Sequence, residues 1–239
     1  DDYLKIRFGN WLTIPENWIQ QINDGVLADD KIISTIPTQA EERSDFKVKI
    51  KLHDSNYHSR MKKMLLYTID QLKKNNIPFW IEAGTLLGIY RDGDLISWDY
   101  DADIGIPAEY SDKVLAMKYK FFPRYIVRKR ANIRRWIPGN TRVVKVKATL
   151  EKLQQINFHI DLFCVYKVKD KYRWIDSDVC KQVDRKFFDT QDSIEWEGRK
   201  IPIPAHTEEY LSLRYGDWRI PSKSYNAGLH DGAIAERGF

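Results

Sequence analysis

The sequence predicts an α+β domain of ordinary globular composition. Of its 239 residues, 43% are apolar and 31% are charged, which excludes disordered, collagen-like and membrane-spanning chains. One long stretch has the apolar spacing of an amphipathic helix, and several short apolar stretches have the alternation of strands. A chain of this length can bury a core without disulfides or a structural metal. We therefore expect one main domain over residues 54–239.

Residues 1–53 differ from the rest in their pattern. They contain two tryptophans and two prolines without a helical or strand-like repeat, so we expect an irregular arm that packs on the main domain. The sequence has no run of about 20 apolar residues, and its first residues, Asp1-Asp2-Tyr3, lack the basic and apolar regions that we expect of a signal peptide. Its first residue is not Met, which is consistent with a piece of a longer protein. The absence of an Asn-x-Ser/Thr sequon favours the cytoplasm over the Golgi lumen.

The clearest helix covers residues 59–74, where apolar residues recur every three or four positions opposite a basic side and the pattern ends before Pro78. A short strand, Phe79–Glu82, follows it. The next residues, 83–88, are typical of a tight turn that opens a second helix. Gly84 allows close backbone approach, and free N–H groups at a helix start attract anions. Such turns mostly connect elements, and phosphate binding is the functional alternative.

The segment Trp98–Ile106 alternates acidic and apolar residues. In a strand, Asp99, Asp101 and Asp103 would form one row on one face. Asp disfavours strands, and two unit charges 4 Å apart repel by roughly 4 kcal/mol at an effective dielectric of 20. A hard divalent cation, Mg²⁺ or Mn²⁺, removes this repulsion, so the row predicts a metal site. The alternative is an acidic loop or edge strand that faces water.

A second apolar strand, Phe158–Phe163, has one carboxylate in its middle, Asp161. An unpaired charge there would be costly to bury. If this strand lies beside the acidic row, Asp161 completes a carboxylate cluster.

The region from Lys113 to Leu150 contains twelve Lys or Arg residues and no Asp or Glu. Val residues alternate with basic ones over residues 142–147, so a strand here would aim Lys145 at the metal site. Arg91, shortly after the Gly-Thr turn, is the other candidate for binding phosphate. We expect most of the other cations to form a solvated face or to contact an anionic lipid or polymer.

The remaining metal-ligand residue types give no pattern. Two cysteines, Cys164 and Cys180, are too few for a disulfide framework or a four-cysteine zinc site, and we expect structural thiols. The five histidines lack metal-ligand spacing, so each is expected to be an ordinary packing or surface residue.

Taken in order over residues 59–221, these motifs resemble the LicD family, which includes fukutin and fukutin-related protein. The motifs are Gly84-Thr85-Leu86-Leu87-Gly88, Arg91, Trp98-Asp99-Tyr100-Asp101-Ala102-Asp103, His159-Ile160-Asp161-Leu162-Phe163, and Tyr210-Leu211-Ser212-Leu213-Arg214-Tyr215-Gly216-Asp217-Trp218 with Pro221. The resemblance implies the nucleotidyltransferase fold of DNA polymerase beta, with a mixed central sheet flanked by helices. Two residues, Glu82 and Asp92, depart from the family pattern.

The resemblance also implies residue roles. Asp101, Asp103 and Asp161 match the catalytic carboxylates, and together with Asp99 they match the ligands of Mg²⁺ or Mn²⁺. Gly84 and Thr85 match the turn that holds donor phosphates, and we add Arg91 and Lys145 as substrate contacts. We expect Asp161 also to accept the acceptor's proton.

The leading functional hypothesis is metal-dependent phosphotransfer. The family moves phosphocholine, glycerol phosphate or ribitol phosphate from a CDP-activated alcohol to a glycan hydroxyl, so we expect a CDP-alcohol donor and a glycan or glycoconjugate acceptor. We expect no nucleic-acid partner and no transmembrane segment, with peripheral membrane contact as an option.

Three alternatives stay open. A nucleotidyltransferase would use the same carboxylates, transfer NMP from an NTP and release pyrophosphate. A glycosyltransferase that uses Asp101-Ala102-Asp103 would release a nucleoside diphosphate, but it does not explain the upstream Gly-Thr turn. A non-enzymatic binder of polyanions or nucleic acid would explain the basic region, but it leaves the acidic row unexplained.

Overall fold

The computed structural model describes residues 55–131, 141–149 and 158–237, which all belong to one compact unit, residues 48–239. The expected arm, residues 1–53, lies outside the described residues, so its packing on the main domain stays a prediction. Among the described helices, none is both long enough and apolar enough to cross a membrane.

The first described helix is the amphipathic helix that the sequence predicts, and it begins at Ser55 rather than Ser59. The helices are α4 Ser55–Lys74, α5 Ala83–Asp92, α6 Ser111–Ala116, α7 Lys118–Phe121 and α9 Thr207–Tyr215, with 3-10 turns at Ala108–Tyr110 and Arg185–Phe187. The apolar stripe of α4, including Met61, Leu65 and Ile69, is fully buried. Lys73 and Lys74 in its last turn suit the negative end of the helix dipole.

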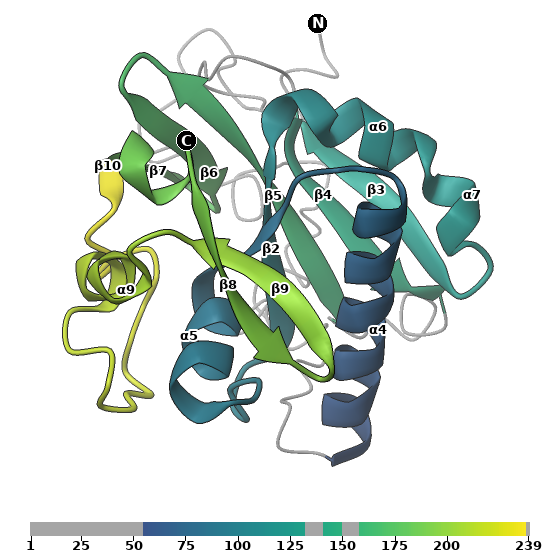
Figure 1. Cartoon of the computed structure of the whole chain (residues 1–239), viewed down its shortest axis with the longest axis horizontal. Coiled ribbons are helices and arrows are strands. Elements are labelled where there is room, and N and C mark those ends of the chain that lie inside the picture. The colour runs from purple at the N-terminus through teal and green to yellow at the C-terminus, as the bar shows by residue number, and fades with distance from the viewer. Residues whose placement is uncertain (1–54, 132–140, 150–157, 238–239) are drawn as a thin grey trace, which may run out of the picture. The chain divides into compact units, whose positions relative to one another are not determined.

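The strands form a mixed sheet, so the predicted α+β class is confirmed (Figure 1). They are β1 Trp80–Ile81, β2 Asp101–Pro107, β3 Tyr125–Ala131, β4 Thr141–Ala148, β5 His159–Val168, β6 Lys171–Asp176, β7 Val179–Asp184 and β10 Ile234–Arg237. Their order is β1-β2-β5-β6-β7-β10, with β4 also pairing β5 and β3 pairing β4. Among the described pairs only β2–β5 is parallel. A separate hairpin joins β8 Gln191–Trp196 to β9 Arg199–Pro204.

The two faces of the central strands differ in chemistry. One face is apolar and has no exposed area at Ala102, Ile104, Val144, Val146, Ile160 and Leu162. Helix α4 contacts β2 and β5, α6 contacts β3 and β4, and α7 contacts β3 (Figure 1). Because side chains alternate along a strand, the intervening residues of β2, β4 and β5 project from the opposite face, and several of them are charged.

Two local details differ from the expectation. The helix predicted to open at residues 83–88 does form there, but it begins at Ala83, so Gly84 and Thr85 lie in its first turn rather than in a turn before it. Asp99 does not lie in the strand, since β2 starts at Asp101. Instead, the Asp99 N–H donates to the carbonyl of Ile96 at 3.1 Å in a tight turn.

Candidate active site

Carboxylates that are far apart in the sequence meet because β2 and β5 are parallel and in register. Asp103 is the Cα partner of Asp161, and Asp101 is the partner of His159. Partners in register project to the same face of a sheet. The structure therefore brings Asp101, Asp103 and Asp161 together on the polar face.

Lys145 joins this group from β4. Its Cα partner on β5 is Asp161, and its Nζ lies 2.6 Å from Asp161 Oδ2. Both side chains are largely shielded, with 17% and 14% exposed. The other oxygen, Asp161 Oδ1, is buried and has no hydrogen-bond partner among the described residues. Lys145 thus compensates one oxygen and leaves the other available.

Asp99 reaches the same place from the turn before β2. The Asp99 and Asp101 carboxyl groups lie close enough to share a hydrogen bond, and the Tyr100 N–H donates to Asp99 Oδ1 at 2.9 Å. A Cβ added to Gly84 would lie only 2.6 Å from Asp99 Oδ2. Glycine is therefore required at position 84 for Asp99 to approach the helix. We call Asp99, Asp101, Asp103 and Asp161 the carboxylate cluster.

The first turn of α5 is bonded directly to β2 at Asp103. Thr85 Oγ1 accepts a hydrogen bond from the Asp103 N–H at 2.8 Å, and the Glu82 N–H donates to the Asp103 carbonyl at 3.1 Å. These bonds fix the helix start against the cluster. The structure thus gives Thr85 a role in holding Asp103, and its contact with a phosphate stays a prediction.

The cluster has unevenly shifted pKa values. Burial, and then the neighbouring carboxylates, raise the pKa of Asp101 and Asp103 well above the ordinary value. Burial also raises the pKa of Asp99. Burial pushes the pKa of Asp161 up too, but His159 and Lys145 outweigh it, so that this pKa is lowered. Asp161 is therefore a weak proton acceptor in this arrangement and suits the role of a permanent anion.

His159 lies beside the carboxylate cluster, a placement that the sequence analysis did not predict. Its Nε2 lies 3.4 Å from Asp161 Oδ1 and 3.6 Å from Asp101 Oδ2, and burial lowers its pKa, which favours the neutral imidazole. Its Nδ1 is buried without a hydrogen-bond partner among the described residues. Its position two residues before Asp161 in a strand was the available indication, because such residues share a face.

Arg91 is not brought to the carboxylates. It lies in the last turn of α5, roughly 10 Å along the helix from Gly84 at 1.5 Å per residue. Its Nε and Nη2 donate to the Asp92 carboxylate, and its Nη1 donates to the Trp218 carbonyl at 3.2 Å.

The donor set fits a hard divalent cation. Carboxylate oxygens are the ligands that Mg²⁺ and Mn²⁺ prefer, and Asp161 Oδ1 is buried with only His159 Nε2, 3.4 Å away, facing it among the described residues. Within the described parts of the chain, however, no three His, Cys, Asp or Glu side chains form a ready-made metal site. Two of the carboxylates already have partners, because Asp161 bonds Lys145 and Asp99 bonds Asp101. Metal binding would require these bonds to be exchanged.

Comparison with known proteins identifies a family and related transferases. The family model described as LicD/FKTN/FKRP, nucleotidyltransferase domain, matches residues 76–206, more than half of the chain. Human ribitol-5-phosphate transferase FKTN is 26% identical over 179 residues, which cover 71% of this chain and 35% of the relative. Human ribitol 5-phosphate transferase FKRP is 24% identical over 162 residues, which cover 66% of this chain and 32% of the relative.

A solved structure of the lincosamide antibiotic adenylyltransferase LnuA, bound to lincomycin, is 16% identical with a TM-score of 0.41, covering 62% of this chain and 83% of that one.

The chain spans about a third of the length of FKTN and FKRP. The family match includes the α5 start, all four members of the carboxylate cluster, and Lys145. The chain therefore belongs to the LicD/FKTN/FKRP family, and the matched part is the nucleotidyltransferase domain of that family.

Proposed function

We propose that this domain transfers a phospho-alcohol group from a CDP-activated donor to a glycan hydroxyl, in a reaction that requires Mg²⁺ or Mn²⁺. The observation that carries the proposal is the register of β2 and β5, which places Asp103 opposite Asp161, with Lys145 bonded beside them. The names of FKTN and FKRP as ribitol-5-phosphate transferases support phospho-alcohol transfer as the reaction class.

The carboxylate cluster would hold the metal through Asp101, Asp103 and Asp161, with Asp99 beside Asp101. A bound divalent ion would neutralise and orient the donor phosphates. Lys145 could exchange its bond to Asp161 for a bond to a phosphate oxygen. Its ammonium group pairs with either anion, and its long side chain can turn from one to the other. The cluster and Lys145 would then present the donor to the acceptor in a fixed orientation.

In the proposed reaction, the acceptor hydroxyl oxygen forms a bond to the phosphorus that carries the alcohol. The phosphoanhydride bond to the second phosphate breaks, so CMP leaves with that bond's electron pair. The hydroxyl proton passes to a carboxylate oxygen or to water. Positioning and charge stabilisation account for most of the acceleration in reactions of this class.

The runner-up is transfer of NMP from an NTP. The name of the matched domain, nucleotidyltransferase, favours it, and the carboxylates suit both reactions. Family membership disfavours the purely polyanion-binding alternative.

Released nucleotide separates the two reactions. The protein is incubated with CDP-choline, CDP-glycerol, CDP-ribitol and each NTP, with Mg²⁺ or Mn²⁺, and the products are identified by mass. We expect CMP from one CDP-alcohol, and no turnover in excess EDTA. Asp103→Asn should abolish turnover, whereas the exposed Asp170→Asn in the β5–β6 turn should not. Pyrophosphate release from an NTP would support the runner-up, and full activity in EDTA would refute the metal requirement.

A further inference from the structure

The sequence motif Tyr210–Trp218, here called the α9 motif, contacts the residue just before α5. Tyr210 Oη donates a hydrogen bond to Glu82 Oε1 at 2.6 Å, and Arg214 Nη1 bonds the same oxygen. The second oxygen, Oε2, accepts from Trp80 Nε1 at 2.9 Å. Glu82 is 1% exposed, so its charge depends on these partners. The unexpected acid in the family pattern is thus an anchor for the α9 motif.

The α9 motif also contacts the far end of α5. The Trp218 carbonyl accepts the hydrogen bond from Arg91, and the Trp218 ring packs edge-on against Tyr90, with centroids 5.6 Å apart. The motif therefore holds α5 both before its first turn and in its last turn. Through this contact, Arg91 links the end of α5 to the α9 motif.

The start of α5 is the part of the helix that touches the carboxylate cluster. Gly84 makes room for Asp99, and Thr85 bonds the backbone of Asp103. Between Glu82 and these contacts lies Ala83, whose φ of +49° is in the left-handed region that residues with a Cβ rarely adopt. Such a conformation persists only where the surroundings enforce it. The partners of Glu82 on one side, and the bond between Thr85 and Asp103 on the other, hold Ala83 in this conformation.

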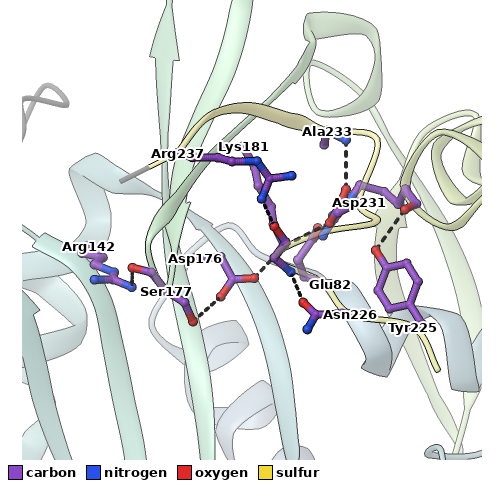
Figure 2. Close-up of polar contacts among 12 residues, drawn as sticks. Glu82, Arg142, Asp176, Ser177, Lys181, Tyr225, Asn226, Asp231, Ala233 and Arg237 are labelled. Carbon is purple, nitrogen blue, oxygen red and sulfur yellow. Dashed lines mark hydrogen bonds and ion pairs between the residues drawn. The ribbon is translucent and has the colours of Figure 1, made fainter. Parts of the chain in front are cut away.

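The anchor continues as a chain of alternating charges. Arg214 Nε lies 2.7 Å from Asp231 Oδ2, Lys181 Nζ lies 3.0 Å from the same oxygen, and Lys181 also bonds Asp176 at 2.6 Å. Figure 2 shows Glu82, Asp231, Lys181 and Asp176 within this group. Arg214 is 1% exposed and Asp231 is 4% exposed. Because each buried cation has an anion on each side, Arg214 is fixed where it meets Glu82.

We propose that the α9 motif positions the first turn of α5 against the carboxylate cluster, with Tyr210 and Arg214 acting through Glu82 as positioning residues. The inference rests on the proposed function, because divalent-ion binding at the cluster is the property that it affects.

Tyr210→Phe tests the proposal, because it removes the hydrogen bond to Glu82 and the one that Tyr210 Oη accepts from Arg214 Nη1 at 2.6 Å, and it keeps the ring. Tyr166→Phe is the control, because it also removes a tyrosine hydroxyl that donates at 2.6 Å, in this case to the Thr141 carbonyl of β4. Mn²⁺ affinity is measured by calorimetry, Tm by thermal unfolding, and backbone order by hydrogen exchange over residues 82–87. We expect Tyr210→Phe to weaken Mn²⁺ binding about three- to tenfold and to speed exchange in that segment. Tyr166→Phe should leave both unchanged.

A rescue variant separates positioning from general stability. Glycine adopts positive φ readily, so Ala83→Gly lowers the need for the anchor to hold this backbone. In the Tyr210→Phe background, Ala83→Gly should therefore recover most of the lost Mn²⁺ affinity. If Tyr210 had a purely structural role, Tm would be lowered in Tyr210→Phe and in the double variant, and Ala83→Gly would not restore Mn²⁺ affinity.

The outcomes distinguish this inference from the proposed function. If the unmodified protein binds no Mn²⁺, the metal-dependent function is wrong, and hydrogen exchange alone decides the positioning role. If Mn²⁺ binds and Tyr210→Phe matches Tyr166→Phe in both affinity and exchange, the positioning role is overturned.

Discussion

Lys145 and Asp161 are direct cross-strand partners, and their side chains meet with Nζ 2.6 Å from Oδ2. On the other side, the Cα partner of Lys145 is Arg128 of β3. Asp103, Asp161, Lys145 and Arg128 therefore occupy one register row across four strands. Along this row the charge changes from negative to positive, which suits a metal at one end and substrate phosphates at the other.

Lys145→Met should weaken donor binding, because it removes the cation next to the cluster but keeps an unbranched side chain. We expect the KM for the CDP-alcohol to rise about tenfold, the size of a lost charged hydrogen bond. Lys129→Met is the control, since Lys129 is exposed and pairs with Val144 on the opposite face of β4. Equal KM values for the two variants would remove Lys145 from the substrate site.

Gly84→Ala should impair metal binding without destabilising the domain. The new Cβ would lie 2.6 Å from Asp99 Oδ2, so the carboxylate must move. Alanine is also the better helix former, so Tm should not fall. We expect Mn²⁺ affinity to drop about tenfold by calorimetry, the usual effect of disturbing groups around metal ligands. Gly228→Ala, whose nearest neighbour is Asn226 Oδ1 at 3.3 Å, should retain full affinity. Unchanged affinity in Gly84→Ala would separate Asp99 from the metal site.

Arg91→Ala tests whether Arg91 binds phosphate or braces α5. Its contacts with Asp92 and the Trp218 carbonyl indicate bracing, so Tm should fall by about 2–4 °C while the donor KM stays constant. Arg185→Ala, which breaks a partly exposed pair with Asp189, should change neither quantity. A raised KM at unchanged Tm would instead favour the phosphate contact predicted from the sequence.

Asp231 should make the stability of the domain sensitive to acid. Burial raises its pKa, but Arg214 and Lys181 outweigh this and lower it below the ordinary value. Since the unfolded pKa of Asp is about 3.9, the carboxylate stabilises the fold above that pH, and the contribution is lost as the pH falls through the lower folded pKa.

The measurement is Tm from pH 6 to pH 2 for the unmodified protein and Asp231→Asn. At pH 6 the variant should melt about 10 °C lower, because it removes the anion that the buried Arg214 and Lys181 share, and the two curves should converge in acid. The exposed Asp217→Asn should follow the unmodified protein throughout. Parallel curves for Asp231→Asn would contradict the lowered pKa.

The local patterns in the sequence predicted the elements that carry the site. Alternation of valines with basic residues gave the strand that holds Lys145, and an apolar strand with one acid gave the position of Asp161. These predictions succeed because the strand period of two is a property of neighbouring residues. The prediction that Asp99 lies in the strand was wrong, because the chain forms a turn at Ile96–Asp99 instead of continuing the strand. The Asp99 side chain nevertheless reaches Asp101 in the carboxylate cluster.

The tertiary partners could not be read from the pattern. Glu82 looked out of place because its cation, Arg214, lies 132 residues further along the chain. The role of His159 depends on the register between β2 and β5, which only the folded sheet fixes. Arg91 lies near the Gly-Thr turn in sequence, but the length of α5 separates the two in space.

The buried charges also limit how far the gene can be shortened for expression. The family match ends at residue 206, before Arg214 and Asp231. A fragment that stops between those two residues would retain Arg214 and Lys181 in its interior without their shared anion, and it would lose β10, which pairs with β7. We expect such a fragment to accumulate as insoluble protein, whereas one that extends through Arg237 should purify as a monodisperse species.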